Sequence, residues 1–181
     1  MAGLIADKTG ALYGTTGSGG TVSACFGFGC GVVFKLSPPK DGRMPWTEQT
    51  LWSFSGGSDG AFPIAVLIAD KTGALFGTAA SGGDGTNSDN ICFGQLSNGV
   101  VFKLTPPKYG RTTWTETTLW AFSGSSDGCF PVAPLIADAR GTIYGTTQYG
   151  GSSSADPCVG FGCGVVFRLT GTGFVPRASD E

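Results

Sequence analysis

Two carboxylates are the first candidates for chemistry in this chain. Asp59 and Asp127 stand at equivalent places of a repeated Ser-Asp-Gly segment. Equivalent places in neighbouring structural units can bring two carboxylates toward one axis, and glycoside hydrolases use such a pair about 5 to 9.5 Å apart. Asp-Gly is also common turn chemistry, because Asp accepts local amide hydrogens and Gly adopts positive φ. Turn formation is therefore the favoured interpretation, and catalysis is the alternative.

Four phenylalanines in long polar loops form the second group of candidates. They are Phe26, Phe28, Phe93 and Phe161. Exposed aromatic rings beside polar groups are suited to stacking on sugar rings. The same rings can instead fold under their loops as a small local core. The sequence leaves glycan binding and loop packing open.

A third, weaker pattern resembles a calcium loop. Asp84, Asn87 and Asp89 offer side-chain oxygens within a Gly-rich stretch. The order differs from an EF-hand, and Asn87 stands where the Gly-rich calcium repeat has Asp. A solvated loop is therefore favoured over bound calcium. No other cofactor is expected.

The six cysteines predict three disulfides, with free buried thiols as the second interpretation. Two repeats each contain a pair separated by four residues, in the strings CFGFGC and CVGFGC. The middle repeat has Asn98 in place of the second cysteine and gains one in the following segment. A metal site is disfavoured, because the chain has no histidine and lacks the Cys-x2-Cys spacing of zinc sites. The predicted bridges are Cys25 to Cys30, Cys158 to Cys163 and Cys92 to Cys129.

Composition excludes several classes of function. Without histidine the chain cannot build a Ser-His-Asp or Cys-His arrangement. A net charge of −2 and scattered Lys and Arg argue against nucleic acid as a partner. The longest apolar run, residues 61–69, is too short to span a bilayer. Disulfides indicate an oxidising compartment, yet no export signal is visible, so we expect a piece of a longer exported protein.

A long internal repeat must position all these residues. The string GVVFKL at residues 31–36 returns at residues 99–104, and as GVVFRL at residues 164–169. The string LIADKTGALYGTT also returns twice with small changes. Repeats of this length contain one supersecondary unit each.

The middle repeat contains four strand signals. Residues 64–70 and 74–79 form a hairpin through Asp-Lys-Thr-Gly, which suits a tight turn. Residues 99–105 alternate as a strand does, and residues 114–122 are rich in Thr, Trp and Phe. Four antiparallel strands repeated head to tail predict an all-β fold of β-propeller blades. A β-trefoil or another threefold β repeat is the alternative.

The repeats divide the chain into about 2.75 blades in a single repeat domain, residues 1–181. Blade 1 is predicted at residues 3–55, blade 2 at 64–123 and partial blade 3 at 132–170, with residues 171–181 as a tail or weak last strand. A propeller needs about four to eight blades to close. We therefore expect missing blades or self-association that completes a ring.

The recurring blocks carry a family resemblance. In order they are D-x-x-G-x-L/I-Y/F-G-T-T/A, then G-V-V-F-K/R-L, then W-T-E-x-T-L-W-x-F-S-G-x-S-D-G-x-F-P. This arrangement resembles the bacterial tandem repeats called GloVer, found in exported proteins with varied C-terminal anchors. The resemblance covers nearly the whole chain and implies a secreted or surface propeller-like protein of no established activity.

The sequence favours a non-enzymatic, exported repeat segment for adhesion or glycan binding. In a blade, the loop between strands two and three emerges on the same face as the connection to the next blade. This face therefore gathers the long loops, the predicted disulfides and the Ser-Asp-Gly turns, and a site is expected there. The alternatives are a carbohydrate-active hydrolase using Asp59 and Asp127, and a structural spacer.

Overall fold

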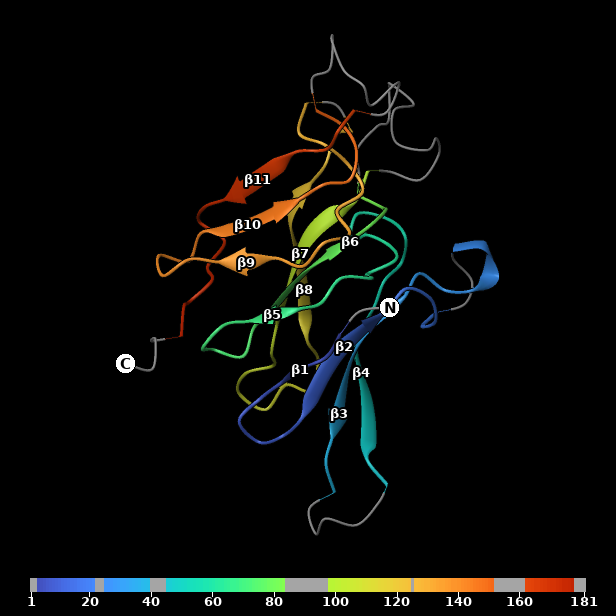
Figure 1. The fold of residues 1–181 in the computed structure, drawn as a ribbon. Helices are drawn as coiled ribbons and strands as arrows, with labels where there is room; N and C mark the ends of the chain where they lie inside the picture. Colours follow the sequence, from blue (N-terminus) through green and yellow to red (C-terminus); the bar gives the residue numbers. More distant parts are fainter. Residues whose placement is uncertain are drawn as a thin grey trace.

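The computed structural model is an all-β fold of three separate antiparallel sheets (Figure 1). It describes residues 3–21, 25–39, 45–83, 98–124, 126–151 and 162–177. Blade 1 has the strand order β1-β2-β3-β4, blade 2 has β5-β6-β7-β8, and blade 3 has β11-β10-β9. The strands are β1 (Ile5–Ala6), β2 (Leu12–Thr16), β3 (Val32–Ser37), β4 (Thr47–Ser53), β5 (Ile68–Ala69), β6 (Leu75–Ala79), β7 (Val100–Thr105), β8 (Thr115–Ala121), β9 (Ile136–Ala137), β10 (Ile143–Thr146) and β11 (Val166–Leu169). These separate sheets confirm the blade prediction over the trefoil alternative.

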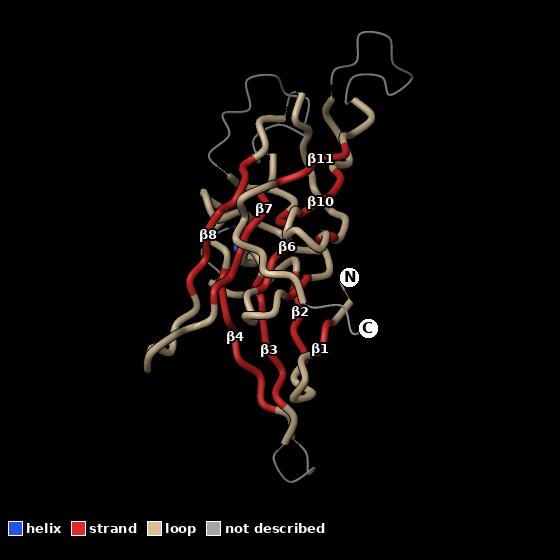
Figure 2. The backbone as a smooth tube through the Cα atoms, turned by 90° about the vertical axis from the view of Figure 1, so that its left-hand side faces the viewer, coloured by secondary structure: helices blue, strands red, loops and turns tan. Residues whose placement is uncertain are grey.

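Each blade uses the same strand register. In blades 1 and 2, Leu12 is paired with Leu36 and Leu75 with Leu104. The equivalent leucine of blade 3, Leu169, is paired with Ile143. In blades 1 and 2 the third and fourth strands also share a bulge, between Val33 and Phe34 of β3 and between Val101 and Phe102 of β7. Figure 2 shows the outer strands β4 and β8 on one side of the molecule, away from β1 and both termini.

An aspartate side chain closes the first hairpin of every blade. In blade 2, Oδ1 of Asp70 accepts hydrogen bonds from the N–H groups of Thr72 and Ala74, at 2.8 and 3.0 Å. Asp7 and Asp138 accept the equivalent bonds in blades 1 and 3. These aspartates are turn formers, as the Asp-x-x-Gly pattern predicts.

Aromatic contacts hold neighbouring blades together. The Phe54 ring, just after β4, packs edge-on against Phe102 of β7, with centroids 5.1 Å apart. Phe122 and Phe167 repeat this contact between blades 2 and 3 at 5.1 Å. Each blade also needs a glycine under its central ring, because a Cβ on Gly77 would lie 2.7 Å from the Phe102 ring. These aromatic contacts place the hydrophobic core between neighbouring sheets.

The first strands are shorter than the sequence predicts. Residues 64–70 were expected as a strand, but β5 contains only Ile68 and Ala69. The chain bends before it, where Phe62 has a φ of 57°. The Phe62 N–H donates to the carbonyl of Cys30, and its carbonyl accepts from Ala80, so this segment connects two blades.

Residues 171–177 form a tail and not a fourth strand of blade 3. In Figure 1 the tail runs down from β11 toward the β5–β6 turn. There the Val175 N–H donates to Oδ2 of Asp70 at 3.2 Å, and the Val175 carbonyl accepts from Lys71. The Phe174 ring lies 5.0 Å from the Phe76 ring.

One substitution in the repeat matches this docked tail. Blades 1 and 3 have Tyr13 and Tyr144 at the place of Phe76, and each hydroxyl donates to Oδ2 of its hairpin aspartate. Phe76 has no hydroxyl, so Oδ2 of Asp70 is free to accept the tail amide. The docking site therefore depends on a Tyr-to-Phe change within the repeat.

Candidate functional site

The loop between β2 and β3 presents two exposed phenylalanines. Phe26 and Phe28 are 77% and 73% exposed. Cys25 and Cys30 form the predicted disulfide across the base of this turn, with their Cα atoms 5.2 Å apart. Cys30 is fully buried, and Phe26 has a φ of 63°, rare for a bulky residue. The rings therefore project into solvent from a turn closed by the disulfide and do not fold beneath it.

The other predicted disulfides are described in part. Cys129 and Cys163 are both disulfide-bonded. Their predicted partners, Cys92 and Cys158, lie outside the described residues, as do Phe93, Phe161 and the calcium candidates Asp84, Asn87 and Asp89.

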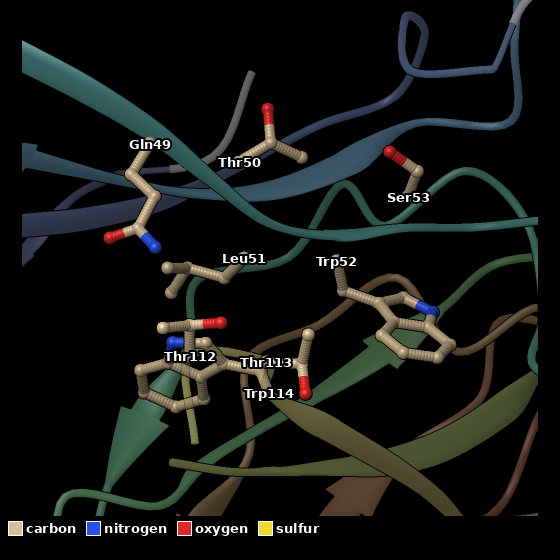
Figure 3. Close-up of a pocket in the computed structure, with 8 residues that line it drawn as sticks. All are labelled: Gln49, Thr50, Leu51, Trp52, Ser53, Thr112, Thr113 and Trp114. Carbon is tan, nitrogen blue, oxygen red and sulfur yellow. The ribbon is translucent and has the colours of Figure 1, made fainter. Parts of the chain in front are cut away.

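A groove of about 330 Å³ lies between blade 1 and blade 2. Its blade 1 wall is residues 49–53 of β4, and its blade 2 wall is residues 112–114, which precede β8. Figure 3 shows Leu51 next to Thr112 and the Trp114 ring, with Trp52 farther along the groove and Thr113 between the two indoles. Aromatic surface next to hydroxyl and amide groups is the composition that sugar-binding surfaces use.

Asp59 supports one end of the groove. Its carboxylate accepts a hydrogen bond from Nε1 of Trp52 at 3.2 Å, which fixes the indole. It also accepts from the N–H and hydroxyl of Ser55, which closes the turn after β4. Asp127 makes the equivalent bonds to Trp120 and Ser123 in the next turn. Each aspartate therefore accepts hydrogen bonds within its own turn, which is the turn-forming interpretation of the Ser-Asp-Gly segment.

The carboxyl group near Asp59 belongs to Glu116 on β8. Burial raises the pKa of Glu116 to about 7; the hydrogen bond from Thr118 opposes this shift, and the negative charge of Asp59 adds to it. The Thr118 hydroxyl lies 3.2 Å from Oε1 of Glu116 and 2.9 Å from the Ser58 carbonyl. A protonated Glu116 can donate to Thr118 while Thr118 donates to Ser58. Glu116 and Asp59 are thus close enough to interact electrostatically between the two blades.

The groove and the disulfide loop adjoin each other. Gly56 lies so close to the disulfide that a Cβ there would be 3.0 Å from both Cys25 and Cys30 sulfurs. The neighbouring Ser55 is held by Asp59, which also holds Trp52. The turn that follows β4 therefore touches the disulfide at Gly56 and holds the Trp52 end of the groove through Asp59. We call the disulfide loop, this turn and the groove together the loop-face site.

Sequence reasoning missed Trp52 and Trp114 of this site, and Glu116 beside Asp59. The signal was present, because the block W-T-E-x-T-L-W occurs in both complete repeats. The glutamate of this block stands on the outer strand of each blade, where a charged side chain is ordinarily exposed. Glu48 is exposed, but Glu116 is half-buried, because the connection that follows blade 1 packs against it.

Comparison with known families agrees with this repeat structure. A family model described as the Gloeobacter/Verrucomicrobia repeat matches residues 1–175. The chain belongs to this repeat family. No curated protein matches this Gloeobacter/Verrucomicrobia repeat chain. Among its described residues, no helix is long and apolar enough to cross a membrane.

Proposed function

We propose that this chain is a non-enzymatic repeat segment that binds glycans through the loop-face site. The observation that carries the proposal is the exposure of Phe26 and Phe28 on a loop closed by a disulfide. Binding through rings on a loop that a disulfide already closes loses little backbone conformational entropy. The adjoining groove supplies Trp52 and Trp114, with Gln49 for hydrogen bonds.

A surface or secreted location accompanies this proposal. The Cys25–Cys30 disulfide is typical of proteins that fold in oxidising compartments. A glycan-binding segment outside the cell would serve adhesion. A structural spacer needs neither a recessed groove nor two solvent-exposed rings, so these features favour a binding role.

The test is glycan-array binding of the full chain and its variants. Replacing both Phe26 and Phe28 by Ala should weaken the apparent affinity for the best ligand about tenfold or more, because each stacked ring contributes roughly 0.5 to 1.5 kcal/mol. Tyr109→Ala is the matched control, since Tyr109 is fully exposed on a different loop. Equal losses in both variants, or no loss in the double variant, would contradict the proposal.

Glycoside hydrolysis is the second candidate, and it now rests on Glu116 and Asp59. A carboxyl group whose pKa is raised by burial, near a second carboxyl group, is the arrangement that such enzymes use. Incubating array-selected glycans with the chain distinguishes the candidates. Shortened products that disappear in Glu116→Gln would support hydrolysis, whereas unchanged glycans would support binding alone.

A further inference from the structure

Blade 3 exposes an edge that the other two blades cover. In blades 1 and 2 the third strand pairs with a fourth strand, β4 or β8. Within the described part of the chain, β11 has only β10 beside it. The three third strands are nearly identical in sequence, GVVFKL, GVVFKL and GVVFRL. The outer edge of this third strand is therefore paired with a fourth strand in blades 1 and 2 and is unpaired in the described part of blade 3.

The exposed fractions of three equivalent valines show how much surface a fourth strand covers. Val33 and Val101 are both 0% exposed, whereas Val166 at the same place in blade 3 is 80% exposed. Val33 is paired with Trp52, and Val101 with Trp120. The difference is not due to residue type, so it reports the open edge directly.

The surface of β8 that faces blade 3 is also less covered than the equivalent surface of β4. Leu51 of β4 is 6% exposed and packs in the core with Trp114 beside it, whereas its equivalent Leu119 in β8 is only half-buried. Trp120 is 44% exposed. Two adjoining hollows of about 400 and 300 Å³ lie between Trp120 and β11. Between blades 1 and 2 the corresponding space receives Trp114, the residue just before β8.

The open edge has backbone groups ready for pairing. The Val165 carbonyl accepts a hydrogen bond from the Thr147 N–H, and the Val165 N–H donates to the Thr147 hydroxyl, so Val165 faces β10. Successive residues of a strand point their backbone groups to opposite sides. The N–H and C=O groups of Val166 and Arg168 therefore point to the open side.

We propose that the outer edge of β11 binds an extended segment with the pattern Trp-Thr-Glu-x-Thr-Leu-Trp, supplied by a further repeat of the same kind. The β7–β8 pairing gives the expected register, with a threonine opposite Arg168 and the glutamate opposite Leu169. The leading tryptophan would fill the hollow beside Leu119, as Trp114 does beside Leu51. This inference goes beyond glycan binding and does not depend on it.

A labelled peptide with the sequence of residues 112–124, titrated into the full chain by fluorescence anisotropy, tests the proposal. We expect saturable binding that a scrambled peptide lacks. Val166→Pro should weaken it about tenfold, because it removes one outward N–H while proline is tolerated on an edge strand. Val166→Thr keeps that N–H and is the matched control. Equal affinity for the wild-type chain and Val166→Pro overturns the proposal.

Two further measurements separate edge pairing from other outcomes. A peptide N-methylated at the amides that face β11 should lose binding to the wild-type chain, and this result does not depend on how any variant folds. Unchanged binding of that peptide counts against strand pairing. A dimer in sedimentation that the peptide does not dissociate but Val166→Pro does would show that a second β11 occupies the edge, and would overturn our choice of occupant.

Discussion

Glu116 and Glu48 occupy the same place in successive repeats but have different surroundings. Glu116 faces the connection that follows blade 1, with the Ser58 carbonyl and the Asp59 carboxylate nearby. Glu48 belongs to the first blade, and its side chain is exposed. The position of a blade in the array therefore changes the chemistry of an identical residue, and pH should reveal the difference.

We expect Glu116→Gln to stabilise the chain at high pH only. Burial first, and then the charge of Asp59, raise the pKa of Glu116 from 4.5 to about 7 in the folded state. The proton therefore favours folding below pH 4.5, and this contribution is lost as the pH rises through 7. Near pH 8 the variant should be more stable by about 1 kcal/mol, a value reduced because Glu116 is half-exposed.

Thermal unfolding of Glu116→Gln from pH 4 to pH 8 checks this expectation. Glu48→Gln is the matched control, since it makes the same change at the exposed, equivalent place in blade 1. A pH-independent effect of Glu116→Gln would contradict the assigned environment of Glu116.

Asn98 is a buried amide at the place where blades 1 and 3 have cysteines. It is 1% exposed, and neither Oδ1 nor Nδ2 has a hydrogen-bond partner in the described structure. A buried unpaired polar group costs about 1–3 kcal/mol. We therefore expect Asn98→Ala to leave the melting temperature unchanged or raise it, although Asn98 is in the interior.

The matched control for Asn98 is a buried polar side chain that has partners. The Thr147 hydroxyl accepts from the Val165 N–H and donates to the Tyr149 carbonyl. Thr147→Ala should lower the free energy of unfolding by about 1–3 kcal/mol, because it leaves the Val165 N–H without a hydrogen-bond acceptor. If Asn98→Ala is as destabilising as Thr147→Ala in chemical denaturation, the buried Asn98 amide does not lower the free energy of unfolding, and the expectation is wrong.

At the level of strands and turns, the features that depend on neighbouring residues could be predicted from the sequence. The Asp-x-x-Gly turns, the alternating GVVFKL strands and the disulfide within CFGFGC depend on residues close in the chain. The Glu116–Asp59 contact, the Trp52–Trp114 groove and the tail docking could not be predicted. Each depends on how one blade is placed against the next or against the tail, and strand periodicity contains no information about that placement.

The tail should be released by restoring the tyrosine that blades 1 and 3 contain. In Phe76→Tyr the new hydroxyl can donate to Oδ2 of Asp70 and compete with the Val175 N–H. The hydroxyl would also lie at the buried contact with Phe174. We expect the Val175 amide to exchange hydrogen about tenfold faster or more, as the population of the docked tail falls.

Hydrogen exchange by NMR should locate that change at the tail. Phe174→Ala is a second route to the same result, because it removes the ring contact and leaves the Asp70 turn intact. Amides of β3 and β4 in blade 1 serve as internal references in both variants. Unchanged Val175 exchange in both would show that the tail is held by other contacts.

Across the whole molecule, blade 2 is the only described blade with a neighbouring sheet on each side. All five residues of β6 are buried, whereas β2 has one buried residue of five and β10 one of four. The stability of a repeat array is approximately the sum of each repeat and its interfaces. Blade 2 contributes to both interfaces, Phe54–Phe102 and Phe122–Phe167.

We therefore expect backbone amides of β6 and β7 to exchange most slowly with solvent, and those of β10 and β11 to open at lower free energy. Blade 3 combines a single neighbouring sheet with an open edge, so its strands have the least burial to lose. Native-state hydrogen exchange in low denaturant measures each opening free energy. Equal protection in all three blades would mean that they unfold as one cooperative unit, in which the open edge of β11 carries no penalty.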